Sequence, residues 1–185
     1  YEIYQCDWSS DVCSSDLMDL DDFRGVIHSK FHGNFVEAFY RTHNLKYTRE
    51  EITQPWLTVP ESKQVAKYVV ARSPRWRRNL PNTFDLYQHF IRQYDFVNQA
   101  VFVGLPEEHK DFVDTFNVNI KYYPVSDFLE LAQVIDGCEM FFGNQTFTYG
   151  IAQGLNKSTV LETFTDRVNL LVNECFFNRP NCYYF

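Results

Sequence analysis

The chain has 185 residues, which is the size of one ordinary domain. Its formal net charge is −7. No apolar run approaches the roughly 18 residues needed to span a bilayer, and no secretory signal is visible, although a truncated chain could have lost one. A net-acidic domain is also a poor candidate for a general nucleic-acid binder. The 18 Phe and 12 Tyr residues favour a well-filled core and a surface suited to stacking.

The first seventeen residues resemble a translated sequencing adapter rather than an evolved protein segment. The stretch Asp7–Asp16 fits the codons GAC TGG AGT TCA GAC GTG TGC TCT TCC GAT, and Tyr1-Glu2-Ile3 fits TAC GAG AT, which precedes a sample index in such libraries. We therefore leave residues 1–17 out of the fold prediction and expect them to be disordered. This segment holds four acidic residues and no Lys or Arg, so the charge of the remaining chain is −3.

Three cysteines remain, Cys138, Cys175 and Cys182. Without C-x-x-C spacing they predict neither a zinc site nor a disulfide framework, and they fit a reducing cytosol, although pairing of Cys175 with Cys182 stays open. The histidines have no acidic or cysteine partner at metal-ligand spacing. Asp19-Leu20-Asp21 resembles a metal-binding D-x-D motif but follows no strand, so it is interpreted as a helix-start acid cluster. We predict no metal and no cofactor, and a cytoplasmic location that includes the inner face of a membrane as an alternative.

Residues 18–64 are predicted to be a remnant of an N-terminal domain followed by a linker. Asn34–His43 has the pattern of one helix, and the loop after it contains Pro55-Trp56 and Pro60. This segment is too short to bury a core of its own. We expect the junction near residues 17 and 18 to lie inside that N-terminal domain.

From Val65 onward, short apolar runs alternate with amphipathic stretches, which predicts βαβ units around a parallel sheet. The predicted strands are Tyr68–Ala71, Ala100–Val103, Ile120–Tyr122, Met140–Phe142 and Thr159–Leu161. The predicted helices between them are Phe84–Tyr94, Glu107–Phe116, Asp127–Ile135 and Thr146–Leu155. Strictly alternating strands and helices are typical of a doubly wound α/β domain with a mostly parallel, Rossmann-like sheet.

Local signals predict where several of these helices begin and end. Thr83 is expected to cap the first helix, and Ser126 is expected to cap the third. Gly137 is expected to end the third helix as a C-cap. The periodicity of that helix predicts one buried apolar face, formed by Phe128, Leu131, Ala132 and Ile135.

A basic loop follows the first predicted strand. It runs from Arg72 to Asn79 and holds four arginines within seven residues, and guanidinium groups match phosphate oxygens in geometry. A pyrophosphate site, a solvated basic loop and a nucleic-acid anchor stay open as alternatives. The last is the weakest, because one basic loop on a net-acidic domain gives little electrostatic attraction for nucleic acid.

Three further segments follow strands at the edge where open α/β sheets bind ligands. Gly143-Asn144-Gln145-Thr146 leads into a helix, whose first N–H groups suit an anion or an ordinary N-cap. Gly104–His109 offers carboxylates for ribose hydroxyls, although acids are common at helix starts. Glu162 ends the fifth strand, where ligand contact and plain solvation both stay open. The chain lacks G-x-G-x-x-G and P-loop motifs, which argues against dinucleotide and P-loop enzymes, and it shows no nucleophile elbow.

Taken together, these segments resemble the C-terminal half of a GT-B glycosyltransferase. They are most similar to the ADP-heptose:lipopolysaccharide heptosyltransferase family, which is like glycosyltransferase family 9, and to its phage and environmental relatives. The resemblance spans roughly residues 33–164 and rests on residues 68–75, on Glu107-Glu108-His109 and on Phe142–Leu155. The last stretch matches the D-T-G-x-x-H-x-A-A-x-L signature at Thr146 and in its helix pattern. It departs from that signature at Gln145, Phe147 and Gly150, which replace Asp, Gly and His.

The resemblance implies a metal-independent enzyme that transfers a sugar from a nucleoside-diphosphate donor to a glycan or lipid-linked acceptor, as in lipopolysaccharide synthesis. Residues 65–185 would bind the donor, which is a substrate and not a cofactor. The family's loop lysine falls at Arg78. The implied contacts are Ser73, Arg75 and Arg78 with the phosphates, Glu108 with the ribose, Tyr123 and Val125 with the base, Asn144, Gln145 and Thr146 with the diphosphate, and Glu162 at the edge of the site.

The catalytic base of this family lies in its N-terminal domain, so no catalytic residue is assigned and the chain alone is expected to be inactive. Two alternatives stay open beside the glycosyltransferase. One is a catalytically silent module that binds sugar nucleotides. The other is a sugar-nucleotide epimerase of the same GT-B shape.

Overall fold

The computed structural model describes residues 40–41, 43–76, 87–92, 95–162 and 179–184. Within these residues, six parallel strands form one sheet in the order β3-β2-β1-β4-β5-β6. β1 pairs with both β2 and β4, so the winding of the chain reverses between β1 and β4. The strands are β1 (Tyr68–Ala71), β2 (Ala100–Phe102), β3 (Lys121–Tyr122), β4 (Met140–Asn144), β5 (Ser158–Glu162) and β6 (Cys182–Tyr184).

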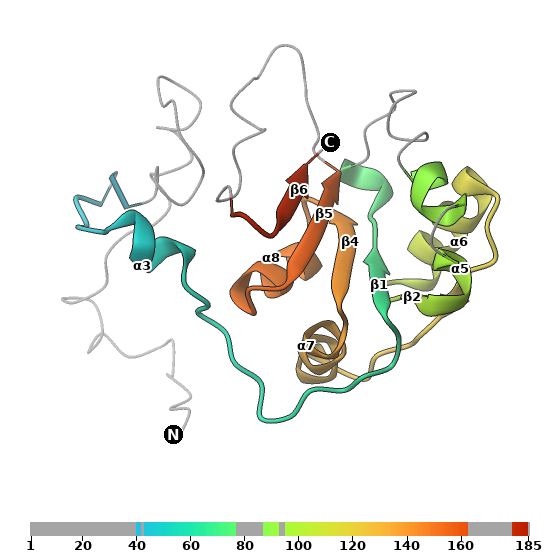
Figure 1. The fold of residues 1–185 in the computed structure, drawn as a ribbon, viewed down its shortest axis with the longest axis horizontal. Coiled ribbons are helices and arrows are strands. Elements are labelled where there is room, and N and C mark those ends of the chain that lie inside the picture. Colours follow the sequence, from blue (N-terminus) through green and yellow to red (C-terminus); the bar gives the residue numbers. More distant parts are fainter. Residues whose placement is uncertain (1–39, 42, 77–86, 93–94, 163–178, 185) are drawn as a thin grey trace, which may run out of the picture.

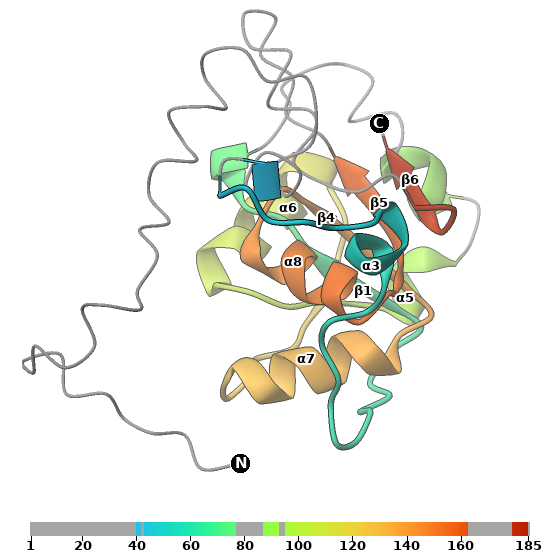
Figure 2. The same ribbon diagram turned by 90° about the vertical axis from the view of Figure 1, so that its left-hand side faces the viewer.

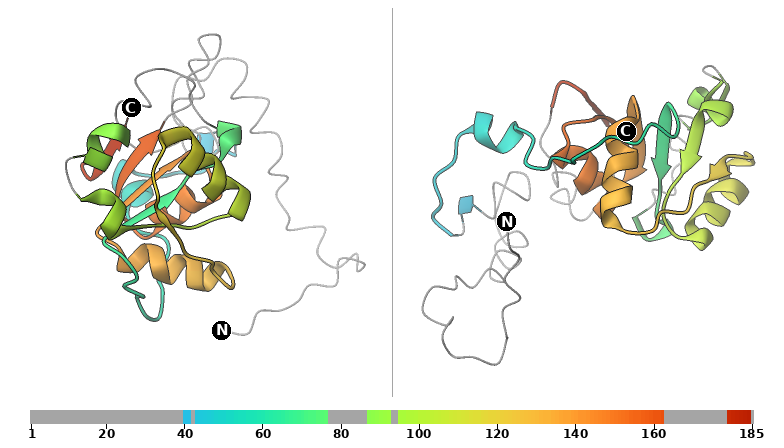
Figure 3. Two further views of the ribbon diagram at one scale, coloured as in Figure 1. Left: turned by 90° about the vertical axis from the view of Figure 1, so that its right-hand side faces the viewer. Right: turned by 90° about the horizontal axis from the view of Figure 1, so that it is seen from below.

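Helices cover both faces of the sheet, which is the middle of three layers (Figure 1). α7 (Phe128–Gly137) and α8 (Phe147–Gly154) cover one face, which Figure 2 shows from the front. α5 (Phe96–Gln99) and α6 (Pro106–Phe116) cover the other face, shown in the left panel of Figure 3. The predicted doubly wound α/β fold is therefore confirmed.

Each face of the sheet has its own apolar core. Val69, Ala71 and Phe141 lie in the core under α7 and α8, whereas Val70 and Phe142 lie in the core under α5 and α6. Since successive side chains of a strand point to opposite faces, a strand buried on both sides needs an unbroken apolar run. The second core is largely aromatic, because the Phe142 ring lies within 6 Å of three other rings, those of Tyr68, Phe90 and Phe96.

The first predicted strand matches β1 without a shift, the ends of the other four shift by at most two residues, and the sixth strand, β6, was not predicted. Two helix-end predictions are wrong. Asp127 caps α7, and its carboxylate accepts a hydrogen bond from Glu130 N at 2.8 Å, while Ser126 only precedes it. Gly137 is the last helical residue, and Cys138 is the C-cap. A Cβ at Gly137 would lie 2.3 Å from the Lys63 carbonyl oxygen, so this glycine permits close packing of two backbones.

Some predictions fall outside the described residues. These are Thr83, Arg78, the tail 1–17, the acid cluster Asp19–Asp21, most of the helix predicted at Asn34–His43, and Cys175 with its open pairing to Cys182. Of the helix predicted at Phe84–Tyr94, residues 87–92 are described and helical. A short helix that was not predicted, α3 (Arg49–Thr53), lies apart from the sheet (Figure 1).

Residues 54–67, which we call the strap, run from α3 to β1 across α7 and α8 (Figure 2; Figure 3, right). Trp56 N and Leu57 N both donate to the Gly154 carbonyl at 3.0 Å, and Lys63 N donates to the Gln133 carbonyl at 2.9 Å. Four apolar side chains of the strap pack on the core beneath α7 and α8: Leu57, Val59, Val65 and Ala66. The strap is thus part of the packed domain from Trp56 onward.

One ion pair ties the strap to the start of α7. Lys63 Nζ contacts the Glu130 carboxylate, which also accepts from Ser126 N at 2.7 Å and from the Tyr123 hydroxyl at 3.1 Å. The pKa of Glu130 is lowered to about 2, chiefly because Lys63 donates to it, with Ser126 adding to the effect. The carboxylate therefore favours the folded state only while it is ionised.

We expect Glu130→Gln to remove part of the acid sensitivity of the fold. A carboxyl group with a lowered folded-state pKa stabilises the protein above its ordinary pKa, and this stabilisation is lost as the pH falls from about 4.5 to about 2. Thermal unfolding followed by circular dichroism across this window should show a shallower pH dependence for Glu130→Gln than for the wild type. Glu107→Gln, at an exposed position of α6, is the matched control; equal slopes for all three proteins would contradict the assignment.

Candidate functional site

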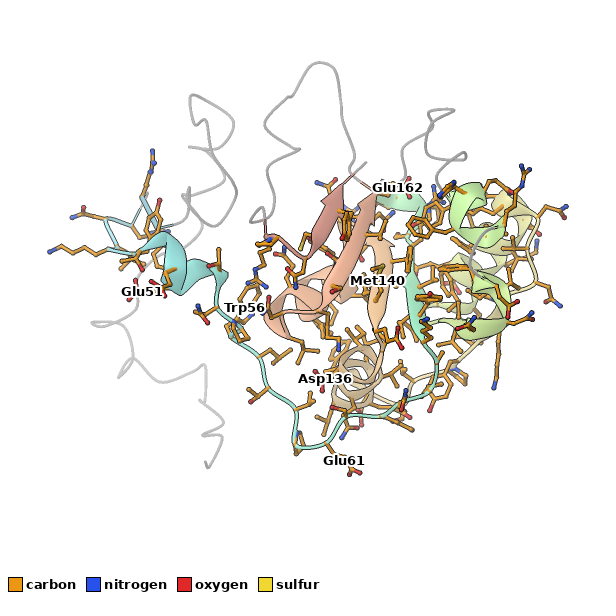
Figure 4. All side chains as sticks on the ribbon, in the orientation of Figure 1. Glu51, Trp56, Glu61, Asp136, Met140 and Glu162 are labelled. Atoms are coloured by element: carbon orange, nitrogen blue, oxygen red, sulfur yellow. The ribbon has the colours of Figure 1, made fainter. Side chains whose placement is uncertain are left out.

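Three polar side chains stand in a row where β1, β4 and β5 end. Ala71 is level with Gly143, so Arg72 follows level with Asn144, which is itself level with Glu162. All three residues are buried. Figure 4 shows Glu162 at this carboxyl edge of the sheet and Asp136 at the other end of the domain. Three strands therefore end together in polar groups at the edge where such folds bind ligands.

Arg72 and Glu162 form a buried bidentate ion pair. Arg72 Nε lies 2.5 Å from Glu162 Oε2, and Nη2 lies 3.0 Å from Oε1. Nη1 lies 3.5 Å from Asp111 Oδ2 on α6, and the guanidinium carbon is 5.1 Å from the centre of the Phe116 ring. Burial acts to lower the pKa of Arg72, but its bonds to Glu162 outweigh this and leave the pKa raised, so Arg72 stays charged.

This pair changes two expectations. Arg72 is 3% exposed and Glu162 is 0% exposed, so Arg72 does not belong to the exposed basic loop and Glu162 is not a solvated carboxylate. Strand alternation is the signal that could have shown this, because residue 72 points to the same face as Val70 and towards α6. The participation of Asp111 has no such signal, since α6 meets β1 only in the folded chain.

The Asn144 side chain is hydrogen-bonded to the loop that follows β1. Its side-chain Oδ1 accepts from Ser73 N at 3.1 Å, and its Nδ2 donates to Ser73 O at 2.7 Å. The amide is completely buried, and it extends the β1–β4 pairing by one step beyond the strands. Asn144 therefore shapes the edge of the sheet, and the neighbouring residues Ser73, Gln145 and Thr146 keep partly exposed side chains.

Thr146 precedes the first turn of α8. Its backbone N donates to Asn144 O at 2.7 Å, and its hydroxyl contacts the Thr148 hydroxyl at 2.7 Å. No side chain caps this helix start, so its first N–H groups point out of the helix beside the loop that carries Ser73. Such groups attract anions. Arg75, in the short 3-10 turn η2 (Pro74–Trp76), is exposed on that same loop.

Glu108 lies beside the end of β2. Its Oε2 accepts from Leu105 N at 3.1 Å, which is the helix-start role left open by the sequence. Gly104 has a φ of +126°, and a Cβ there would lie 2.8 Å from that same carboxylate oxygen, so the turn requires glycine. The Tyr122 hydroxyl donates to the Gly104 carbonyl at 2.9 Å and holds the turn in place.

The residues expected near a base lie beside β3. Tyr123 and Val125 are partly buried against the core under α7 and α8, and the Tyr123 hydroxyl donates to Glu130. Phe128 was predicted to join that core, but it is 72% exposed, because the first turn of α7 projects beyond the packed part of the helix. Neither its exposure nor that of Phe147 could be foreseen from helical periodicity.

The structure thus gathers five of the predicted site residues around the ends of β1 and β4: Ser73, Arg75, Asn144, Gln145 and Thr146. Four others lie beside different strands, Glu108 at β2, Tyr123 and Val125 at β3, and Glu162 at β5, while Arg78 lies outside the described residues. A cavity of about 570 Å³ lies at the opposite, amino edge, where β1, β2 and β3 begin. Its lining includes Lys67, Asn98, Ala100 and Lys121.

Comparison with known proteins adds no family to this picture. No protein-family model matches the chain, and no curated protein sequence matches it either. Among the helices of the described residues, none is both long enough and apolar enough to cross a membrane.

We expect the Arg72–Glu162 pair to behave as one unit in stability measurements. Arg72→Met alone should cost about 3–5 kcal/mol, because it leaves a buried carboxylate without its cation. The double variant Arg72→Met/Glu162→Met should recover much of that loss, because it leaves no buried charge at this pair. Urea unfolding of the two single variants and the double variant measures the coupling. Additive effects of the two substitutions would mean that the two charges do not depend on each other.

Proposed function

We propose that residues 65–185 bind the diphosphate of a nucleoside-diphosphate sugar, as the donor-binding half of a metal-independent GT-B glycosyltransferase. The observation that carries this proposal is the reversal of winding between β1 and β4. At such a reversal the two following loops part to opposite faces and leave a crevice, which is where open α/β sheets bind their ligands. Ser73 and Thr146 lie on these two loops.

The chemistry of the two loops suits a diphosphate. The uncapped start of α8 offers backbone N–H groups and the positive end of a helix dipole. Arg75 is exposed on the facing loop, and the sequence places Arg77 and Arg78 two and three residues after it. Guanidinium groups bind phosphate oxygens through paired hydrogen bonds. The start of α8 would thus supply backbone donors, and the loop that follows β1 would supply positive charge.

A departing nucleoside diphosphate gains negative charge as the bond to the sugar breaks. Donors and cations that are held in position stabilise that charge in the transition state. The two hydrogen bonds between the Asn144 side chain and Ser73 fix the backbone of the loop after β1 before any ligand arrives. Little reorganisation is therefore needed when the ligand binds. The acceptor, a glycan or a lipid-linked sugar, and the base that deprotonates it would belong to a second domain.

Calorimetric titration with ADP-sugars and UDP-sugars tests the proposal. The wild-type chain should bind at least one of them, and Arg78→Ala should weaken binding by about 1.5–3 kcal/mol, the range for hydrogen bonds to charged groups. Arg92→Ala is a matched control, since Arg92 is exposed on the helix at 87–92 and belongs to neither of the two loops. It should leave the affinity unchanged.

Two outcomes would contradict the proposal. Absence of binding at millimolar concentrations of every sugar nucleotide would remove the donor site altogether. Equal effects of Arg78→Ala and Arg92→Ala on affinity would mean that the basic loop is a solvated surface loop that does not contact the phosphates. Turnover of a bound sugar nucleotide without any acceptor would favour the epimerase over the transferase.

A further inference from the structure

Two aromatic side chains are exposed where α7 and α8 begin. Phe128 is the first residue of α7 and Phe147 is the first residue of α8. They are 72% and 62% exposed, and their ring centroids lie 5.0 Å apart in an edge-to-face arrangement. Leu129, the next residue of α7, is also exposed. The two rings therefore contact each other and contribute little to the core.

The ring pair borders the proposed diphosphate site. Phe147 directly follows Thr146 and so lies at the uncapped start of α8. Gly150 lies one turn further along the same side of α8. It is exposed, and a Cβ added there would meet no other atom within 4 Å. The helix surface beside the two rings is thus open, with room for a flat group.

We infer that Phe128, Phe147 and Gly150 form the nucleobase-binding part of the donor site, an inference that rests on the proposed function. The base is the flat aromatic group of a nucleoside-diphosphate sugar, and bases stack favourably on aromatic side chains whatever their identity. A sugar ring in this place would need hydrogen-bond partners for its hydroxyls. The side chains of Phe128, Leu129, Phe147 and Gly150 offer none.

This assignment moves the base away from the position expected from the sequence. The rings and methyl groups of Tyr123 and Val125 are partly buried against the core, so they offer less free surface for stacking. Phe128 lies three residues after Val125 and is largely exposed. Stacking contacts the flat face of a base and not the hydrogen-bonding edge that distinguishes one base from another. The site should therefore bind adenine, guanine and uracil nucleotides with similar affinities.

The experiment compares two probes, ADP and inorganic pyrophosphate, which has no base. Phe128→Ala and Phe147→Ala should each weaken ADP binding on the order of tenfold to 100-fold and leave pyrophosphate binding unchanged. Phe147→Trp, which keeps a flat ring, should retain ADP affinity. Gly150→Leu should also weaken ADP binding, because its side chain fills the open surface. Tyr183→Ala, which removes an exposed ring on β6, is the control and should change neither affinity.

The outcomes separate this inference from the proposed function. If the wild type binds ADP and the Phe128, Phe147 and Gly150 variants bind it equally well, the base lies elsewhere and the donor site stands. If these variants lose ADP and pyrophosphate in parallel, the rings support the helix start and the base assignment is wrong. If the wild type binds neither probe, the proposed function itself fails. Thermal unfolding of each variant shows whether it is folded.

Discussion

The pairing of β1 with β4 is the constraint on which the rest of the structure depends. These two parallel strands stand side by side although about 70 residues separate them in the chain, and the strands added on either side wind in opposite directions. The loops that leave them must therefore part at their carboxyl ends. The buried amide of Asn144 closes the pairing by satisfying both backbone groups of Ser73. The described residues proposed to contact the diphosphate, Ser73, Arg75 and residues 144–146, all follow β1 or β4 at this junction or end β4 there.

A buried ion pair supports the junction from the side of α6, and the strap packs closely on α7 at the other end of the domain. Arg72 reaches past Asn144 to Glu162, so one guanidinium links β1 to β5 and, through Asp111, to α6. On the other face, the strap packs so tightly on α7 that only glycine fits at position 137. An ion pair that costs desolvation energy is retained at the edge where precise loop geometry matters, which we interpret as a contribution to specificity rather than to net stability.

The sequence predicted five strands and the fold class because each of these strands is an apolar run between turn signals. β6 was missed since Cys182–Tyr184, at three residues, is too short to give a clear strand pattern. α3 was missed although Thr48 and Glu51 form a capping box that the sequence displays. The sequence predicted that the candidate site residues follow the strands at the carboxyl edge of the sheet, but it did not predict how their side chains are oriented. Whether Arg72 turns inward and whether Phe128 stays exposed depend on contacts between distant elements, which local patterns do not encode.

The proposed ligand site lies at the carboxyl edge of the sheet, and the cavity at the amino edge provides a direct contrast. Titration of the isotope-labelled chain with ADP, followed by amide chemical shifts in NMR spectra, distinguishes the two edges. We predict that the largest shifts occur at Ser73, Arg75 and residues 145–150, with residues 65–67 and 98–101 unaffected. Shifts confined to the amino edge would contradict this prediction.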